Sequence, residues 1–257
     1  LSAGVPAAVA GEVFVVPYND LSAVEAVVAA HGAGLAAILV EPVAANMGLV
    51  KPEPGFLEGL RRAADRCGAV LIFDEVITGF RFGPTTYGAL CGVIPDLTTL
   101  GKIIGGGLPL AAVGGRADLM DCLAPLGRVY QAGTLSGNPV AVDAGLATLR
   151  MLEREHPYAR IAALTQQAAA HINRRARELG RDLHCAQAGG MFTCFCQRGA
   201  VHNLADAKAS NTQVYAACFH RLLDGDIYLP PSQFEVGFVS MAHTEAETMR
   251  LAKGMVA

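Results

Sequence analysis

The sequence predicts an α/β protein with a mainly parallel sheet covered by helices, followed by a smaller C-terminal α/β domain. Residues 36–41 form an apolar run without alternation, which is typical of a strand covered on both faces. Residues 52–67 carry apolar side chains at helical spacing and stop at Gly68, and a second apolar strand follows over residues 69–73. A strand, a helix and a strand of these lengths predict a right-handed crossover between parallel strands.

The second half of the chain changes character near Glu155-His156-Pro157. Long amphipathic helices are predicted on both sides of this point, over residues 140–152 and 161–179. Residues 183–197 indicate strands interrupted by glycines at 189 and 190, residues 206–223 indicate a helix, and a last helix runs from Thr244 to the end. We therefore expect a larger domain over residues 1–157 and a smaller one over residues 158–257.

Composition narrows the class of protein without identifying it. The chain has 257 residues, of which 52% are hydrophobic, and a net charge of −3, so it can bury a large core and has no electrostatic footprint for nucleic acid or an anionic membrane. No apolar run reaches the roughly 18–20 residues that span a bilayer, and residues 1–6 do not resemble a signal peptide. Seven scattered cysteines without a Cys-x-x-Cys favour reduced thiols in the cytoplasm, and no histidine has metal-ligand spacing with them.

One lysine and one acid stand out as candidate catalytic residues. Lys102 lies in the glycine-dense apolar stretch LGKIIGGGLP, and Asp74 closes the apolar run VLIF. Ligands of open parallel sheets bind at the carboxyl ends of strands. An amine that condenses with an aldehyde and a carboxylate that keeps a pyridine nitrogen protonated are the groups that pyridoxal phosphate chemistry needs. Alone, either residue has a plainer interpretation, a hydrogen-bonded strand-end acid or a surface-loop lysine.

We further expect apolar neighbours to bury the Lys102 amine, which would favour its uncharged form. These neighbours are Leu100, Ile103, Ile104 and Leu108. The glycines at 105–107 would allow the backbone to approach a flat ring closely.

Three segments in order carry a family resemblance: DEVITGFR over residues 74–81, PDLTTLGK over 95–102 and YQAGTLSGNP over 130–139. The chain resembles the class III aminotransferases from about Pro17 to its C-terminus. This resemblance implies a fold-type-I transferase that depends on pyridoxal phosphate. It also implies a small-molecule amino-aldehyde substrate and a homodimer with shared active sites.

The resemblance also implies roles for individual residues. Asn46 would lie near the phenolic oxygen of the cofactor, although a turn residue before Met47-Gly48 is the plainer interpretation. Gly133 and Thr134 would reach the cofactor phosphate of the partner subunit, or simply form a turn before a helix that starts at Asn138-Pro139. For Glu41, at the end of the first strand, we expect a structural role near the site.

Glu235 bears on the type of reaction. The family members that use an external carboxylate donor generally have an arginine in this region, whereas residues 233–238 read QFEVGF. A carboxylate here would repel a second acid and attract a substrate amine. The pattern therefore favours transfer within one amino-aldehyde substrate over transfer from a separate donor, as in an ω-aminotransferase. The plainer interpretation of Glu235 is a surface glutamate. For the chain as a whole, an inactive or purely structural cofactor-binding fragment is the other alternative.

The chain also departs from the family at its start. Family members begin with a substantial segment that carries a phosphate-holding Ser/Gly/Thr loop, an aromatic residue stacked on the cofactor ring and a substrate carboxylate site. Residues 1–20 contain no replacement for them. We therefore expect a truncated chain that retains the cofactor weakly on its own.

Overall fold

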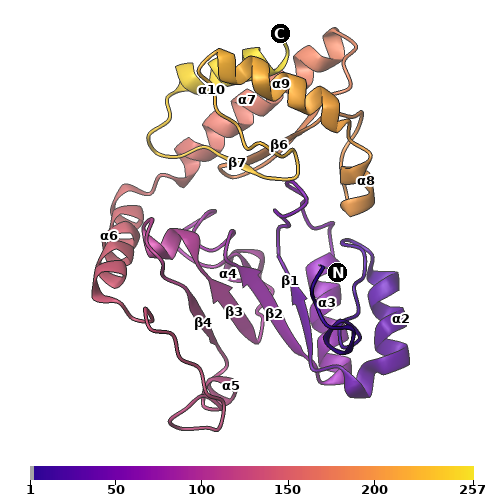
Figure 1. The fold of residues 1–257 in the computed structure, drawn as a ribbon, viewed down its shortest axis with the longest axis vertical. Coiled ribbons are helices and arrows are strands. Elements are labelled where there is room, and N and C mark those ends of the chain that lie inside the picture. The colour runs from indigo at the N-terminus through magenta and orange to yellow at the C-terminus, as the bar shows by residue number, and fades with distance from the viewer. Residues whose placement is uncertain (1–2) are drawn as a thin grey trace.

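Two separate β-sheets organise the protein in the computed structural model, which describes residues 3–257 (Figure 1). The first sheet has four strands in the order β1-β2-β3-β4. They are β1 (Ala37–Val40), β2 (Val70–Glu75), β3 (Leu97–Leu100) and β4 (Ala112–Gly115). The first three strands are parallel, and β4 pairs antiparallel with β3, so the prediction of a mainly parallel sheet is confirmed.

The crossover between β1 and β2 is the helix α3 (Phe56–Cys67), as predicted, but it begins four residues later than expected. Gly55, which precedes it, has a φ of 84°, and Pro52 and Pro54 disfavour helical backbone in the residues before them. The helix ends at Gly68, whose φ is 72°. Its apolar face packs on β2, with a second, unpredicted helix α2 (Leu21–His31) beside it.

The second sheet is antiparallel and has three strands in the order β5-β6-β7. They are β5 (His184–Ala188), β6 (Met191–Phe195) and β7 (Gly237–Phe238). The turn between β5 and β6 falls at Gly189-Gly190, as the sequence predicted. The core of this half lies between the sheet and the helices α7 (Tyr158–Glu178), α9 (Thr212–Asp224) and α10 (Glu245–Met255).

The prediction of one helix over residues 206–223 is wrong. The structure has a short helix, α8 (Leu204–Lys208), and then α9. Asn211 causes the break, because its side-chain oxygen accepts hydrogen bonds from the N–H groups of Gln213 and Val214 and so begins a new helix. Its own N–H donates to the carbonyl oxygen of Cys196, which fixes this start against the second sheet.

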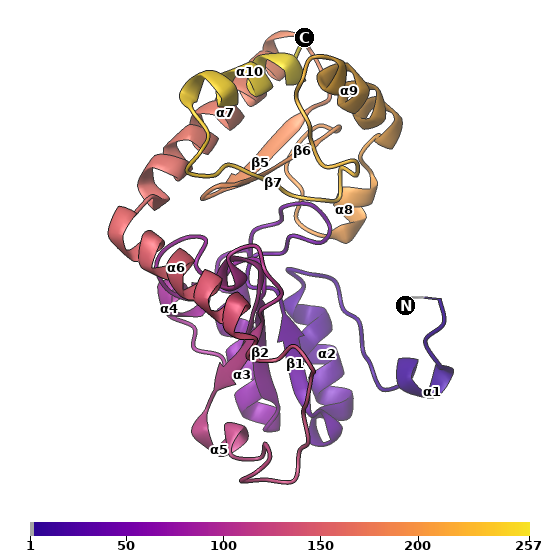
Figure 2. The ribbon, with the colours of Figure 1, turned by 60° about the vertical axis from the view of Figure 1, so that its left-hand side comes forward.

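The helix α6 (Pro139–Glu155) connects the two halves, and Figure 2 shows it beside the first sheet, with α7 continuing to the second. The helix starts at Asn138-Pro139, as predicted: Asn138 caps it and Pro139 is its first residue. His156, with a φ of 43°, separates α6 from α7. Against α6 packs the short 3₁₀ turn η2 (Lys102–Gly105), and the contact is so close that a Cβ atom at Gly145 would overlap the carbonyl oxygen of Ile104.

Several short elements complete the chain: α1 (Ala7–Ala10), η1 (Gly32–Gly34), α4 (Tyr87–Cys91) and α5 (Ala117–Met120). The seven cysteines are all free thiols. Within residues 3–257, no helix combines the length and the hydrophobicity that crossing a membrane would require.

Candidate active site

The carboxyl ends of β1, β2 and β3 meet at one edge of the parallel sheet, because the three strands run in the same direction. Glu41 directly follows β1, Asp74 is the next-to-last residue of β2, and Lys102 comes two residues after the end of β3. The sheet therefore brings the predicted acid and the predicted lysine to adjacent strand ends, about 4.8 Å apart in the hydrogen-bonding direction.

Asp74 is half-buried and held by two hydrogen bonds to the same oxygen. Its Oδ1 atom accepts from the N–H of Val76 and from the hydroxyl of Thr99, each at 3.1 Å. Thr99 is the register partner of Asp74 on β3. The other oxygen, Oδ2, receives no hydrogen bond from the part of the chain that the structure describes. It can therefore accept a hydrogen bond from an N–H group of a ligand.

Lys102 begins η2 and has a φ of 48°, in the left-handed region that a residue with a side chain rarely adopts. The prediction that apolar neighbours bury its amine is wrong for the described residues: Lys102 is exposed, and of the four expected neighbours only Ile104 is buried. The reason is that η2 turns Ile104 and Gly105 toward α6, whereas Lys102 precedes them at the open edge of the sheet. Strained backbone of this kind is found most often at functional sites.

Glu41 organises the loop that carries Asn46. Its two carboxylate oxygens accept hydrogen bonds of 2.8 Å, one from the N–H of Ala45 and one from the side-chain amide of Asn46. Asn46 is exposed, and one N–H of its amide stays available for a ligand. The structural role expected for Glu41 agrees with these contacts.

Gly133 and Thr134 lie in an exposed turn before α6, closed by a hydrogen bond of 2.9 Å from the N–H of Ser136 to the carbonyl of Gly133. Figure 1 shows the segment between α5 and α6 passing outside the first sheet. Strand pairing, which places Asp74 beside the strand that leads to Lys102, does not include these two residues, because they lie outside the four strands of the first sheet.

Glu235 reaches the same loop as Asn46 from the other half of the molecule. Its side chain is exposed, and it follows Phe234, whose carbonyl oxygen accepts a hydrogen bond of 2.6 Å from the N–H of Gly48. The carbonyl of Glu235 itself accepts a bond of 3.0 Å from the hydroxyl of Thr193 in β6. Gly48 and Phe234, 186 positions apart in the chain, are thus joined by a direct hydrogen bond.

Sequence reasoning missed two residues beside these groups. Thr99 supports Asp74, and the two threonines between the leucines of β3 were the available signal. Arg81 closes the DEVITGFR segment; its Nε donates to the carbonyl of Ile77 at 2.7 Å, and its guanidinium lies over the ring of Phe238, 4.2 Å from the centroid. Burial lowers the pKa of Arg81 to about 10, so it is still a cation at neutral pH.

Glu75, next to the candidate acid, has a structural task instead. It is fully buried and accepts hydrogen bonds from the N–H groups of Tyr87 and Gly88 at the start of α4 and from the hydroxyl of Thr78. Burial raises the pKa of Glu75, although the N–H groups of Gly88 and Tyr87 act against this shift. Adjacent acids in one strand therefore face different environments, as the alternation of side chains in a strand requires.

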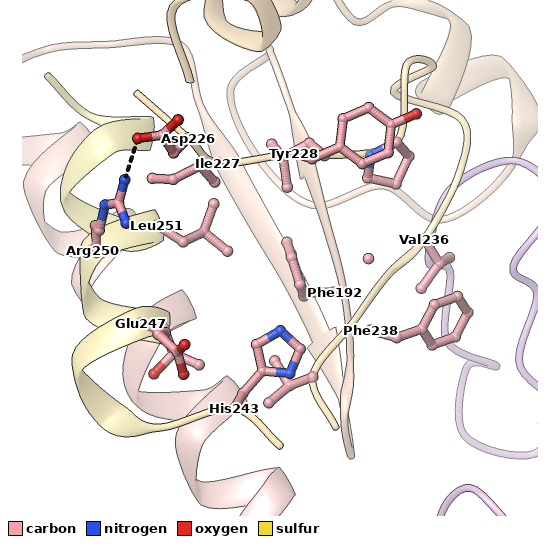
Figure 3. Close-up of a pocket in the computed structure, with 15 residues that line it drawn as sticks. Phe192, Asp226, Ile227, Tyr228, Val236, Phe238, His243, Glu247, Arg250 and Leu251 are labelled. Carbon is pink, nitrogen blue, oxygen red and sulfur yellow. Dashed lines mark ion pairs between the residues drawn. The ribbon is translucent and has the colours of Figure 1, made fainter. Parts of the chain in front are cut away.

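A pocket of about 490 Å³ lies between β7, the segment 226–230 and α10 (Figure 3). Its charged groups serve local structure: Glu247 accepts a hydrogen bond of 2.7 Å from the N–H of Thr244, and Arg250 bonds the carbonyl of Gly225 and lies 3.9 Å from Asp226. None of the predicted site residues lines this pocket. We therefore place the candidate site at the edge of the parallel sheet and not in this pocket.

Relatives with assigned activities are similar to this chain over nearly its whole length. Residues 3–220 match the family described as Aminotransferase class-III. The chain is 51% identical over 245 residues to a glutamate-1-semialdehyde 2,1-aminomutase from Bordetella avium, covering 95% of this chain and 57% of the relative. A protein of the same name from Roseiflexus castenholzii is 52% identical over 245 residues, with coverage of 95% and 56%. The chain thus spans somewhat more than half the length of these curated relatives.

Solved structures also resemble this chain in fold, at lower sequence identity. An omega-transaminase from Sphaerobacter thermophilus superimposes with a TM-score of 0.91 at 32% identity, covering 99% of this chain and 58% of the other. A glutamate-1-semialdehyde aminomutase from Pseudomonas aeruginosa, solved in complex with PMP, gives a TM-score of 0.83 at 30% identity and coverage of 94% and 55%. The predicted fold-type-I class is confirmed by these likenesses, and the chain belongs to the class-III aminotransferase family.

Proposed function

We propose that the chain is the greater part of a pyridoxal-phosphate-dependent aminomutase that converts glutamate-1-semialdehyde to 5-aminolevulinate, the precursor of tetrapyrroles such as porphyrins. The observation that carries this proposal is the pairing of strands β2 and β3, which sets a supported carboxylate, Asp74, beside the strand that leads to Lys102. The similarity to two aminomutases at 51–52% identity supports the choice of reaction.

The residues at the sheet edge fit the cofactor chemically. Asp74 keeps one oxygen free for the N–H of a pyridine ring, and Lys102 presents an exposed amine two residues beyond the neighbouring strand. Asn46 retains an N–H for a phenolic oxygen. When bound, pyridoxal phosphate supplies an aldehyde that accepts an amine and a ring that withdraws electrons, and its PMP form holds the amine.

Each residue then has a distinct task. Asp74 holds a proton at the ring nitrogen, which requires a carboxylate that is anchored but not neutralised, and its two bonds to Oδ1 provide that. Lys102 binds the cofactor covalently, and its amine moves a proton at the substrate carbon. Asn46 orients the ring, with Glu41 fixing its amide.

Glu235 would bind the substrate amine. Its carboxylate is exposed, and its backbone is fixed by Thr193, so an ammonium group could approach it without breaking an existing side-chain bond. The same charge disfavours a second carboxylic acid as amino donor. This favours an intramolecular transfer over an ω-aminotransferase reaction with a separate donor.

The active unit would be a homodimer, with Gly133 and Thr134 contacting the cofactor phosphate of the neighbouring subunit. Large apolar side chains are exposed around this turn; Leu126 is 79% and Tyr130 83% accessible, and Val140 is 69% accessible. Exposed apolar side chains of this size suit an interface that a second copy of the chain would cover.

We also propose residues 1–157 as part of the larger, cofactor-binding domain and residues 158–257 as the smaller domain. The two sheets fall on either side of His156, where the chain passes from α6 to α7. A cytoplasmic location is proposed with them, on the support of seven free cysteines.

Borohydride reduction of the cofactor-loaded protein tests the role of Lys102. The chain has four lysines, at positions 51, 102, 208 and 253, so peptide mapping distinguishes them. We expect one labelled peptide, the one that contains Lys102, and no label in Lys102→Ala. Labelling mainly at Lys51 or Lys208 would overturn the assignment.

Turnover of glutamate-1-semialdehyde without any other amino donor tests the reaction. We expect 5-aminolevulinate to form from this substrate alone. A requirement for a separate donor would indicate an ω-aminotransferase. Labelling of Lys102 without either turnover would indicate a protein that binds the cofactor but is inactive.

Mixing two defective subunits tests the shared site. A heterodimer of Lys102→Ala and Thr134→Ala subunits has one site with both defects and one with neither, so mixing should restore part of the lost activity. If subunits exchange and activity does not recover, Thr134 serves its own subunit.

A further inference from the structure

The hydroxyl of Thr193 joins the two halves of the molecule at the candidate site. Its Oγ1 atom accepts a hydrogen bond of 3.0 Å from the N–H of Leu49, in the loop after β1. The same atom donates a bond of 3.0 Å to the carbonyl oxygen of Glu235. Thr193 is only 3% exposed, so water does not compete for either bond.

The Thr193 hydroxyl therefore acts as an acceptor and as a donor at the same time. A hydroxyl has one hydrogen to donate and lone pairs that accept, and Thr193 uses the hydrogen for one half of the protein and a lone pair for the other. Replacing the hydroxyl by a methyl group would leave a backbone N–H and a backbone carbonyl without their partner at this joint.

The surroundings leave little room for the joint to adjust. Gly48 has a φ of 78°, and a Cβ atom there would lie 3.0 Å from the methyl carbon of Thr193 and would overlap the ring of Phe195. The N–H of Gly48 also donates to the carbonyl of Phe234 at 2.6 Å. The loop after β1 and the segment that precedes β7 are thus held in one relative position.

These two segments carry Asn46 and Glu235. In the proposed function, Asn46 orients the cofactor ring and Glu235 binds the substrate amine. We propose that Thr193 is a positioning residue that sets the spacing between them, and through it the affinity for an amine-bearing substrate. The inference rests on the proposed function for the identity of the substrate, but not for the joint itself.

Two substitutions in the holoenzyme separate the hydroxyl from the shape of the side chain. Thr193→Val keeps the shape and removes both bonds, whereas Thr193→Ser keeps both. With Val we expect KM for glutamate-1-semialdehyde to rise about tenfold, with kcat changing less than about threefold, and the cofactor to dissociate several-fold more readily in an absorbance titration. With Ser, both quantities should return to within about threefold of the original protein.

Thr165→Val is the matched control. Thr165 is also buried, at 1% exposure, but its hydroxyl donates only to the carbonyl of Ile161 in its own helix α7. We expect this variant to leave KM and cofactor affinity unchanged.

Hydrogen exchange at the Leu49 amide provides a readout that does not depend on activity. It should accelerate about tenfold in Thr193→Val and stay unchanged in Thr193→Ser and Thr165→Val. If Thr193→Val does not fold, Thr193→Cys, which keeps the size and only a weak donor, takes its place with the same expected direction.

The proposal is overturned if Val and Ser impair KM equally, or if Val behaves as the Thr165 control does. Failure of the proposed function has a different signature. In that case the original protein does not turn over glutamate-1-semialdehyde, while the Leu49 exchange and the cofactor titration still report on Thr193.

Discussion

Asp96 ties together the strands that carry the candidate site, from the opposite end of the sheet. Its Oδ2 atom accepts hydrogen bonds from the N–H of Leu71 at 2.7 Å and from Arg61 at 2.8 Å, and its Oδ1 atom accepts one from Arg116 at 3.0 Å. It is 7% exposed. Burial alone would raise the pKa of Asp96, but the bonds from Leu71, Arg61 and Arg116 outweigh it and hold the pKa below its ordinary value.

The substitution Asp96→Asn should destabilise the protein by about 2–3 kcal/mol. The amide oxygen can replace Oδ2 and keep two bonds, but both lose the negative charge of the acceptor, a loss of about 1 kcal/mol each. The amide NH₂ then faces Arg116, which is half-exposed and retains its pairing with Asp118, so this bond adds roughly 0.2–1 kcal/mol. Urea denaturation at pH 7 measures the sum.

The same substitution should flatten the acid limb of the stability profile. Since the folded pKa of Asp96 lies below its unfolded value of 3.8, its contribution is complete above that value and is lost as the pH falls through the folded pKa. The difference between the original protein and Asp96→Asn should therefore be constant above about pH 5 and shrink below about pH 4.

Asp65→Asn is the control, because Asp65 pairs with the same Arg61 but its side chain is 63% exposed. We expect it to cost less than about 1 kcal/mol. Equal losses for the two variants, or a loss at Asp96 that does not change between pH 3 and 7, would refute the reasoning.

Three further substitutions follow from the hydrogen bonds. Asp74→Asn should lower kcat by at least about a hundredfold, because a neutral amide does not hold the ring proton; turnover near the original rate in the loaded enzyme would assign that role to another acid. Thr99→Val removes one of the two bonds to Asp74 and should lower kcat by about tenfold or less; a loss as large as that of Asp74→Asn would show that Thr99 does more than orient. Asn138→Ala removes the cap of α6 and should cost about 1 kcal/mol, or about 2–4 °C in Tm; calorimetry that detects no shift would contradict it.

Local patterns in the sequence were enough to predict the crossover β1-α3-β2, the hairpin at Gly189-Gly190 and the helix start at Asn138-Pro139. Each depends on residues close together in the chain. The break before α9 was missed, since the apolar spacing of residues 206–223 continues across Asn211, and only its bonds to Gln213 and Val214 end one helix and start another.

Contacts between residues far apart in the chain could not be predicted from the sequence. The motif around Lys102 identified the lysine, but its exposure depends on η2 turning toward α6, a helix that begins more than 30 residues later. Likewise nothing near Thr193 reveals that Leu49, 144 residues away, donates to it. The family resemblance identified candidate residues, and the strand pairing in the structure showed which residues contact them, such as Thr99 beside Asp74.

The contact between Gly145 and Ile104 makes the position of the lysine sensitive to a residue that takes no part in chemistry. An alanine at Gly145 would force α6 and η2 apart by roughly 1 Å, since carbon and oxygen atoms need more than 3 Å between them. Lys102 is in that turn, and a displacement of this size at a reacting group can cost about a hundredfold in rate. Substitutions should therefore be poorly tolerated at this helical glycine, although it lies far from Lys102 in the sequence.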